Sequence, residues 1–345
     1  MKKCFSYYIK YERILKCGIK NIIGVKLVKS EKPRKIALLM GGRSSEREIS
    51  IKTGKQISRA LAEQGYKVRE IDPARDLVKD LEDFQPDVVF IALHGRYGED
   101  GTIQGLLEIL GYPYTGSGVL SSALCMDKVT SKKVMLYEEI PTPSFKVVKT
   151  EKLDQDTVEN MIKELGLPLV VKPVREGSTL GITIVKEADE LIKAITEALK
   201  YDQTVLVEEF IDGIELTAAV LGTKDPQALP LIEIVSETGF YDYTAKYSPG
   251  MSHHIIPARI SPETTKQVKE LAVRTYKAMD CHQYSRVDFM ISKEGKPYVL
   301  EVNTIPGMTE TSLFPDAAKA AGISFAQLVS LLVDEAFSLS LEEKR

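Results

Sequence analysis

The chain has 345 residues, of which 43% are hydrophobic and 28% charged, with a formal net charge of -3. This composition indicates a globular protein of two or three domains and excludes collagen-like and low-complexity chains. The acidic balance argues against a nucleic-acid-binding protein, and no run of about 18 apolar residues predicts a membrane-spanning helix. Four cysteines without a CxxC pair predict neither a disulfide framework nor a zinc site, which suits a cytoplasmic protein.

The first 35 residues carry eleven Lys or Arg against Glu12 and Glu31, so the rest of the chain is more acidic than the total suggests. This segment lacks the long apolar core and small-residue cleavage site of a secretory signal. We expect residues 1–34 to be a disordered basic extension or the result of a start codon assigned too early. An arm that binds nucleic acid or a membrane surface is the alternative, but nothing further along the chain supports either partner.

A first α/β domain is predicted over residues 35–126. Three apolar runs predict its buried strands, namely Lys35–Met40, Lys67–Ile71 and Asp87–Leu93. Ser45 and Glu48 form a capping-box pattern before a helix that runs to about Gln64, and a second helix is expected at Thr102–Leu110. Because strands and helices alternate, we predict a Rossmann-like parallel sheet covered on both faces.

Two further blocks combine strands and helices without strict alternation, which favours α+β layers. The central block is predicted over residues 127–211 and the C-terminal block over 212–340. The central strands are expected at Ser144–Val148, Leu169–Pro173, Ile182–Val185 and Val205–Phe210. The later elements are expected at Glu215–Leu221, Leu229–Ile234, Pro262–Met279 and Ala317–Phe337, the last two being helices. A loop at 237–254, rich in Tyr and Gly, is the candidate lid over a site.

The segment 286–303 carries the most informative local pattern. Glu294 and Gly295 predict a two-residue turn between two apolar-rich strands. If the strands pair outward from this turn, two polar residues of one strand lie directly opposite two polar residues of the other. All four side chains then project from the same side of the hairpin. The opposed pairs are Asp288 with Glu301 and Arg286 with Asn303.

Two directly opposed carboxylates repel each other unless a cation lies between them. Carboxylate and amide oxygens without His or Cys select a hard ion such as Mg²⁺, so Asp288, Glu301 and Asn303 are predicted metal ligands. Arg286 is predicted to hold a substrate oxyanion. The alternative is a solvent-exposed hairpin face on which Arg286 pairs with Asp288.

Other residues have both a functional and an ordinary interpretation. Lys172 ends a strand before a glycine-containing loop, where it can meet phosphates or be a surface lysine. Glu215 and Phe210 suit a ribose and a base, or an amphipathic edge strand. Glu46 is a carboxylate expected in the first turn of a helix, and His94 follows a strand at the edge where α/β sheets bind ligands.

Seven motifs occur in order along the chain. They are Gly41–Ser50, Ala92–Gly101, Tyr114–Gly118, Met126–Lys128, Val171–Ser178, Tyr241–Tyr247 and Glu301–Met308. Together they resemble the D-alanine–D-alanine ligase family from about Lys35 to Gln327. The resemblance implies a three-domain ATP-grasp fold and ATP-dependent joining of two D-alanines through an acyl phosphate for peptidoglycan. It also implies ATP and two Mg²⁺ or Mn²⁺ as cofactors, a cytoplasmic location and a homodimer.

The resemblance also implies a role for each matching residue. The residues around the first D-alanine would be Glu46, held by Ser178 and Tyr247, and His94. The phosphate contacts would be Lys128, Lys172 and Lys246. The adenine and ribose contacts would be Glu208, Phe210, Ile211 and Glu215. The metal ligands would be Asp288, Glu301 and Asn303. The oxyanion donors would be Arg286 and the Gly307 amide. The second D-alanine would meet Ser312 and Leu313.

Two departures from the family pattern are Ile305, where many relatives have Ser, and Glu310, where His is common. Glu310 bears on recognition of the second amino acid. Two alternatives stay open: a ligase that takes D-lactate or D-serine second, and a nucleotide-binding regulatory module without catalysis. Tyr247 favours D-alanine over D-lactate, and Arg286 argues against a purely binding module.

Overall fold

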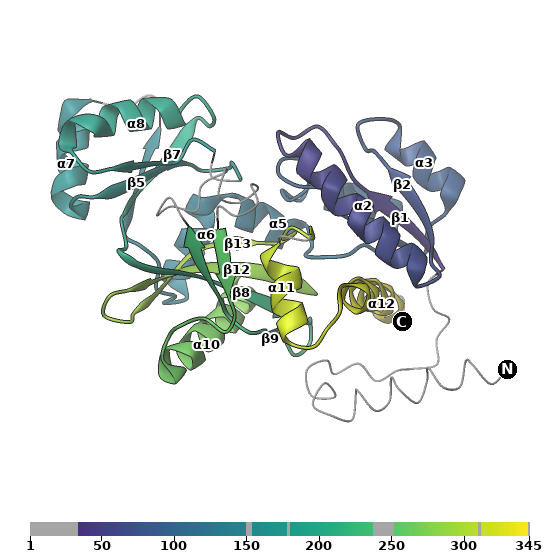
Figure 1. The fold of residues 1–345 in the computed structure, drawn as a ribbon. Helices are drawn as coiled ribbons and strands as arrows, with labels where there is room; N and C mark the ends of the chain where they lie inside the picture. Colours follow the sequence, from purple (N-terminus) through teal and green to yellow (C-terminus); the bar gives the residue numbers. More distant parts are fainter. Residues whose placement is uncertain (1–33, 150–153, 178–179, 237–251, 310–311, 344–345) are drawn as a thin grey trace.

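The computed structural model describes residues 34–149, 154–177, 180–236, 252–309 and 312–343. It contains three β-sheets, each built from a consecutive section of the chain. Figure 1 shows the first sheet with α2 on one side of the molecule, the four-stranded sheet on the other, and the third sheet below them. The parallel and antiparallel sheets with their helices confirm the predicted mixed α/β class.

The first sheet is parallel, as predicted, with strand order β2–β1–β3. Its strands are β1 (Lys35–Leu39), β2 (Lys67–Ile71) and β3 (Val88–Ile91). Its helices are α2 (Arg47–Glu63), α3 (Leu77–Phe84) and α4 (Thr102–Leu110). The prediction that β2 is buried was wrong, because β2 is an edge strand that exposes most of its side chains. The sequence pattern did not reveal α3, which has only eight residues.

The capping-box prediction for α2 was also wrong. The helix begins at Arg47, its N-cap residue is Glu46, and no side chain caps it. Ser44 Oγ instead accepts a hydrogen bond from the Glu46 amide (3.2 Å) and donates one to the His94 carbonyl (2.6 Å). The helix start is therefore fixed to the loop after β3, which brings Glu46 and His94 together.

Asp72 stabilises the glycine-containing turn after β1 through hydrogen bonds. Its Oδ1 accepts hydrogen bonds from the amides of Gly42 (3.0 Å) and Ala74 (3.1 Å), and its Oδ2 accepts one from Arg47 Nη2 (2.7 Å). Burial alone would raise the pKa of this carboxyl, but Arg47 and the two amides outweigh it and lower the pKa from 3.8 to about 2. Such a group stabilises the fold above its unfolded pKa and loses this contribution as the pH falls.

We expect Asp72→Asn to lower the free energy of unfolding by about 1 kcal/mol at pH 7, after allowance for the solvent exposure of the ion pair. Wild type and variant should converge as the pH falls from 3.8 toward about 2, between the unfolded and folded pKa values. Urea unfolding at neutral and acidic pH measures this, with the exposed Asp83→Asn as control. A difference that widens toward acid would contradict the assignment.

The second sheet is antiparallel, with strand order β4–β7–β5–β6. Its strands are β4 (Phe145–Lys149), β5 (Leu169–Pro173), β6 (Thr183–Val185) and β7 (Thr204–Glu209). The helices of this section are α5 (Val119–Met126), α6 (Lys128–Tyr137), α7 (Gln155–Leu165) and α8 (Leu191–Ala198). Apolar residues of α7 and α8 cover one face of the sheet. On the other face, Val129 of α6 packs with Leu206 and Phe145.

The third sheet has strand order β11–β10–β8–β12–β13, with β9 paired to β8. Its strands are β8 (Gly213–Leu221), β9 (Gln227–Ala228), β10 (Ile232–Ser236), β11 (Ser252–Ile255), β12 (Tyr284–Ser292) and β13 (Pro297–Asn303). Helix α10 (Pro262–Ala278) packs on this sheet. The strand predicted at Leu229–Ile234 begins later, at Ile232. Residues 252–254 of the predicted lid loop belong to β11, and 237–251 lie outside the described residues.

The β12–β13 hairpin keeps the predicted register at its polar end through two compensating departures. The turn has three residues instead of two and is closed by a hydrogen bond from the Ser292 amide to the Lys296 carbonyl (2.9 Å). This shifts the neighbouring pairs by one residue, and a β-bulge at Leu300 shifts the pairing back. The opposed pairs are Asp288 with Glu301 and Arg286 with Asn303.

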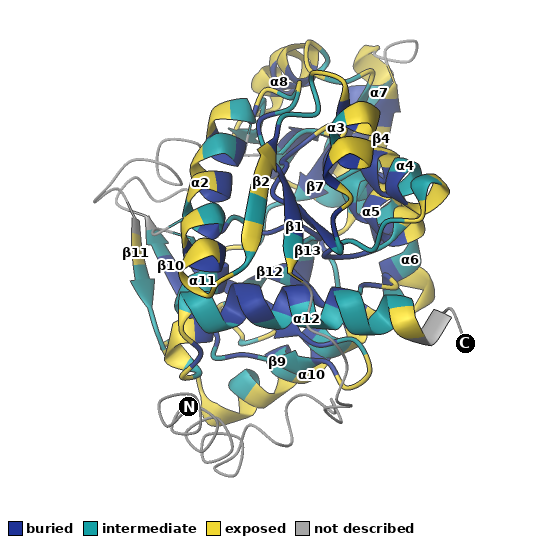
Figure 2. Cartoon of the chain, turned by 90° about the vertical axis from the view of Figure 1, so that its right-hand side faces the viewer, coloured by how far each residue is buried: buried dark blue, intermediate teal, exposed yellow. Residues whose placement is uncertain are grey.

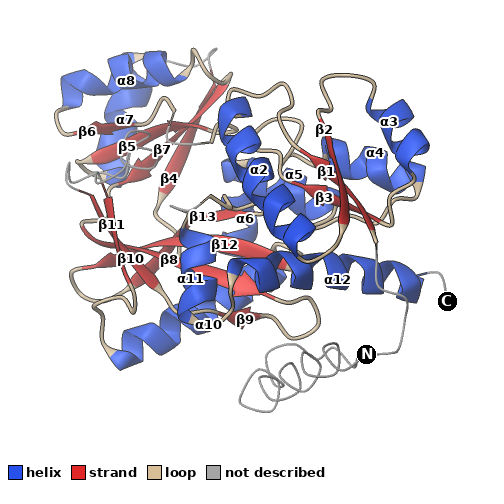
Figure 3. Ribbon diagram, turned by 45° about the vertical axis from the view of Figure 1, so that its right-hand side comes forward, coloured by secondary structure: helices blue, strands red, loops and turns tan. Residues whose placement is uncertain are grey.

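The terminal helix predicted over Ala317–Phe337 is two helices, α11 (Leu313–Ala320) and α12 (Phe325–Glu343). Gly322, with φ +82°, lies in the break between them. Helix α12 packs against α2 and β3 and shares their apolar core (Figures 2 and 3). In the described part of the chain, no single helix is long and apolar enough to cross a membrane. Among the described helices, the pair α11 and α12, bent by 100°, reaches that length and composition together.

Candidate active site

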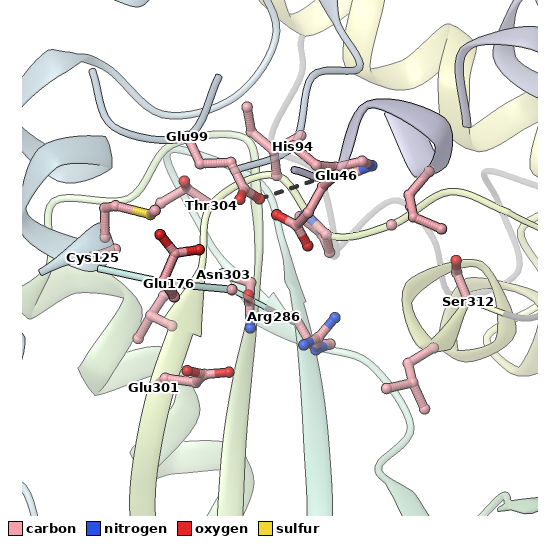
Figure 4. A pocket seen from close by; sticks show the side chains of 18 of the residues that line it. Glu46, His94, Glu99, Cys125, Glu176, Arg286, Glu301, Asn303, Thr304 and Ser312 are labelled. Atoms are coloured by element: carbon pink, nitrogen blue, oxygen red, sulfur yellow. Dashed lines mark ion pairs between the residues drawn. The ribbon is translucent and has the colours of Figure 1, made fainter. Parts of the chain in front are cut away.

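A pocket lies where the loops after β1 and β3 meet the β12–β13 hairpin, the α5–α6 junction and the start of α11. Figure 4 shows Glu46 and His94 on one side of the pocket and the hairpin side chains on the other, with Glu176 between them. The predicted site residues that line the pocket are Glu46, His94, Lys128, Arg286, Glu301, Asn303, Gly307, Ser312 and Leu313.

Two glycines make room for the Glu46 carboxylate, which is only 8% exposed. A Cβ atom on Gly95 would stand 2.7 Å from Glu46 Oε2, and one on Gly177 would stand 3.0 Å from the same oxygen. Glu46 therefore lies between the loop after β3 and the loop after β5. A buried anion in this position suits a cationic ligand group.

His94 is buried between Thr53 and Glu99. Its Nε2 lies 3.1 Å from Thr53 Oγ1, and its Nδ1 forms an ion pair with Glu99 Oε1 at 3.8 Å. Burial alone would lower the pKa of the His94 imidazole, but Glu99 and the nearby charge of Glu46 outweigh it, so the pKa is raised. The raised pKa favours an imidazolium, which suits an anionic ligand group.

Both carboxylate oxygens of Asp288 have hydrogen-bond donors. Oδ1 accepts from Thr217 Oγ1 (2.6 Å) and Arg286 Nε (2.8 Å). Oδ2 accepts from Arg286 Nη2 (2.7 Å) and Asn303 Nδ2 (3.1 Å). Asp288 itself is only 8% exposed, although the Arg286–Asp288 pair of the alternative is present.

Lys128 links the hairpin to the loop after β5. Its Nζ lies 3.4 Å from Glu301 Oε2 and donates a hydrogen bond to the Glu176 carbonyl at 2.8 Å. The backbone start of α6 is fixed by Asp127, whose side chain accepts from the Thr130 amide. A lysine at the first position of α6 is thereby held beside a carboxylate of the third sheet.

The donor set on the hairpin fits Mg²⁺, because two carboxylates and one amide on a single face offer only oxygen ligands. Within the described residues no three His, Cys, Asp or Glu side chains could hold a metal, and Asn303 would supply the third ligand. Arg286 balances the charge of Asp288, and Lys128 that of Glu301. Since the donors already fill both Asp288 oxygens, binding of an ion by Asp288 requires one donor to move aside.

Glu208 is a buried carboxylate between two lysines. Its Oε2 lies 2.5 Å from Lys172 Nζ, and its Oε1 lies 2.8 Å from Lys132 Nζ. Burial alone would raise the pKa of Glu208, but the charges of Lys172 and Lys132 outweigh it and lower the pKa. Glu208 is therefore held as an anion, and this group adds one net positive charge on the sheet face toward α6.

Among the described residues, the other predicted site residues do not line the pocket. Phe210 and Ile211 join β7 to β8, between the second and third sheets. Glu215 on β8 lies opposite Met290 of β12, so it shares the face of Asp288. Three predicted residues, Ser178, Lys246 and Tyr247, lie outside the described residues.

Two family models match the chain. One, described as D-ala D-ala ligase N-terminus, matches residues 72–117, and the other, described as D-ala D-ala ligase C-terminus, matches residues 134–334. A D-alanine--D-alanine ligase of Pelotomaculum thermopropionicum is 53% identical over 304 residues, which are 87% of this chain and 96% of the relative. One of Carboxydothermus hydrogenoformans is 54% identical over 302 residues, covering 87% and 97%. The chain belongs to the D-alanine–D-alanine ligase family.

Solved structures of the D-alanine–D-alanine ligase family share the fold. The ligase of Bacillus anthracis complexed with ATP matches with a TM-score of 0.78 and 38% identity, covering 90% of this chain and 99% of that one. The ligase of Coxiella burnetii matches with a TM-score of 0.77 and 30% identity, covering 90% and 97%. The predicted resemblance is therefore confirmed.

Sequence reasoning missed several residues of this ligase-family site. Lys132 is an ordinary member of a helical pattern, and nothing in its spacing predicts that it reaches Glu208. Glu99 lies in the same sequence motif as His94, four residues after Gly95. Its contact with His94 could therefore have been predicted from the shortness of the loop. Thr217 became a partner of Asp288 only through the pairing of β8 with β12, which no local pattern predicts.

Proposed function

We propose that this protein uses ATP to join two D-alanines into D-alanyl-D-alanine, for peptidoglycan synthesis in the cytoplasm, through an acyl phosphate. One observation carries the proposal: a single pocket collects the buried carboxylate of Glu46, the guanidinium of Arg286 and the hard-ion donors Glu301 and Asn303. Relatives that share half of the sequence are named D-alanine--D-alanine ligases, which supports the same reaction here.

The first D-alanine carries an ammonium and a carboxylate, and we assign a partner to each. Glu46 binds the ammonium, assisted by Ser178 and Tyr247, and His94 lies beside the carboxylate. A carboxylate is a poor electrophile, so its oxygen first attacks the γ-phosphorus of ATP. The bond between the γ-phosphorus and the ADP oxygen breaks. In the resulting acyl phosphate, the acyl carbon carries phosphate as a good leaving group.

The amine of the second D-alanine then attacks the acyl carbon. The resulting tetrahedral intermediate carries an oxyanion, which Arg286 and the Gly307 amide stabilise by hydrogen bonds. Phosphate leaves as the carbonyl re-forms, and the attacking nitrogen loses a proton. Ser312 and Leu313, at the N-terminus of α11, receive the second substrate's carboxylate, where the helix dipole favours an anion.

The nucleotide is assigned to the region where the second and third sheets meet. Lys128, Lys172 and Lys246 contact its phosphates, because three cations offset the repulsion between ATP and an anionic substrate. The contacts to adenine and ribose are Glu208, Phe210, Ile211 and Glu215. Lys172 reaches a phosphate by giving up its contact with Glu208.

Two Mg²⁺ or Mn²⁺ ions are assigned to Asp288, Glu301 and Asn303. When bound, such ions neutralise phosphate charge and align the phosphoryl group for transfer. The side chains that balance the two carboxylates in this structure, Arg286 and Lys128, are the same ones assigned to the oxyanion and the phosphates. Loading of the site therefore requires at least one donor of Asp288 to move aside.

The organisation around the site is also part of the proposal. The domains are assigned to residues 35–126, 127–211 and 212–340, with residues 1–34 as an extension. The exclusion of water from the acyl phosphate is assigned to the predicted lid loop at 237–254, whose last three residues lie in β11. Two copies form a homodimer, which light scattering coupled to size-exclusion chromatography tests directly.

Phosphate release with D-alanine, D-lactate, D-serine and L-alanine as substrates, at saturating Mg·ATP, tests the reaction. We expect release with D-alanine and, by mass spectrometry, formation of D-alanyl-D-alanine. A mixed product of D-alanine with D-lactate or D-serine as the main species would favour the second candidate specificity. ATP binding without any phosphate release under these conditions would favour a regulatory module and overturn the proposal.

A further inference from the structure

Lys132 is a buried lysine that the reaction above does not use. It lies on α6 and its side chain is 1% exposed. Its ammonium has three oxygen partners, which are Thr142 Oγ1 at 2.6 Å, the Pro143 carbonyl at 3.0 Å and Glu208 Oε1 at 2.8 Å. An ammonium has three N–H donors; hydrogen bonds to Thr142 and Pro143 use two of them, and the contact with Glu208 Oε1 is an ion pair.

The surroundings hold this lysine in one place. Thr142 Oγ1, which accepts a hydrogen bond from Lys132, donates one to the Val299 carbonyl of β13 (2.8 Å). The ammonium also lies 5.1 Å from the centre of the Phe145 ring. Lys132 therefore connects the second sheet to the strand that carries Glu301 and Asn303, and it has little freedom to follow a ligand.

Lys172 differs from Lys132 although both contact Glu208. Its side chain is 10% exposed, and its ammonium forms an ion pair with Glu208 Oε2. Glu208 therefore contacts a fully buried lysine, Lys132, through Oε1 and a slightly exposed lysine, Lys172, through Oε2. Glu208 Oε1, although 2.8 Å from Lys132, accepts no aligned hydrogen bond from a described residue and keeps acceptor capacity.

We propose that Lys132 is a positioning residue for the nucleotide: it holds Glu208 as an oriented carboxylate while Lys172 exchanges Glu208 for a phosphate. The proposal rests on the proposed function, because Glu208 and Lys172 are assigned there to adenine and phosphate. A carboxylate accepts from the 6-amino group of adenine but repels the 6-oxo group of hypoxanthine. Lys132 therefore supports discrimination of ATP from inosine triphosphate.

The charges around Glu208 set the expected pH dependence. Lys132 on α6 and Lys172 on β5 face the carboxylate, and Glu209 adds a negative charge near Lys132. Without Lys132, less positive charge opposes the effect of burial, so the pKa of Glu208 rises. A protonated Glu208 then gains population as the pH falls, and a carboxylic acid can donate to the 6-oxo group.

The test compares wild type with Lys132→Met, which keeps side-chain length, and with Lys133→Met as the matched control. Lys133 is the exposed neighbour on the same helix. Phosphate release with ATP and with inosine triphosphate gives the ratio of the two kcat/KM values from pH 6 to 9. We expect Lys132→Met to lower this ratio about tenfold, mainly through KM for ATP, and more at acidic than at alkaline pH. KM for D-alanine and the ratio of the control should match wild type.

A second variant keeps the test decisive if Lys132→Met does not fold. Thr142→Val removes one of the three acceptors of Lys132 and keeps its charge, and we expect a shift of about twofold in the same direction. A folded variant that retains the wild-type nucleotide ratio at every pH would overturn the positioning role. An inactive wild type would instead overturn the proposed function, so the two failures are distinguishable.

Discussion

Replacing Glu301 with Gln is expected to lower kcat by more than 100-fold while the protein remains folded. The substitution removes an anionic ligand from the proposed metal site, and loss of a direct ligand should exceed the roughly 10–100-fold cost of outer-shell changes. The fold should survive, because the Glu301 side chain is 29% exposed and Lys128 keeps its hydrogen bond to the Glu176 carbonyl. Steady-state kinetics over a range of Mg²⁺ concentrations measure both the loss and any rescue by excess metal.

The matched control is Glu294→Gln, at the exposed tip of the same hairpin. It makes the same chemical change far from the pocket and should leave kcat and the Mg²⁺ dependence unchanged. Near-normal turnover of Glu301→Gln would rule out the ligand role of Glu301. An equal loss in both variants would point to the hairpin fold instead.

Arg286→Lys is expected to lower kcat by about 100- to 1,000-fold, the range found when an oxyanion donor is removed. KM for ATP should change little, because the proposed role of Arg286 lies in the acyl transfer. Lysine cannot reproduce the planar pair of donors that Arg286 offers to Asp288, but it keeps the charge that compensates this buried carboxylate. We therefore expect a stability loss of only about 1–2 kcal/mol.

Arg259→Lys serves as the comparison for Arg286→Lys. Arg259 also binds a carboxylate, that of Glu233, but its side chain is 64% exposed and does not line the pocket. Thermal unfolding and kcat, measured for both variants, separate the two effects. If Arg286→Lys kept at least a third of wild-type kcat, the oxyanion role would be wrong.

The elements of the fold were largely predictable from local pattern. The strand Leu169–Pro173 and the helix Thr102–Leu110 have the predicted bounds, because each has a clear apolar pattern with polar or glycine residues at its ends. The errors occurred where distant contacts decide. The start of α2 is fixed by the hydrogen bond of Ser44 to the loop after β3, and not by the predicted capping box of Ser45 and Glu48. The chain turns at Gly322 because α12 packs against α2.

The polar pairs of the β12–β13 hairpin have the predicted register, although the turn between its strands differs from the prediction. The predicted two-residue turn is wrong, yet Asp288 still faces Glu301 because the bulge at Leu300 cancels the shift of a three-residue turn. A local pattern predicts that two strands pair, but the register also depends on packing of both strands against the core. The family resemblance was less sensitive to such detail, because it depends on many motifs in order.

The sequence by itself determined the family, the mixed α/β class and several of the polar residues of the pocket, since these depend on motif order and on periodicity. Only the tertiary structure decided which charges neutralise one another. Lys132 reaches Glu208 across 76 positions of chain, and Thr217 reaches Asp288 across 71. Burial raises the cost of an unpaired charge, so these partners are chosen by the folded neighbourhood and leave no periodic signal in the sequence.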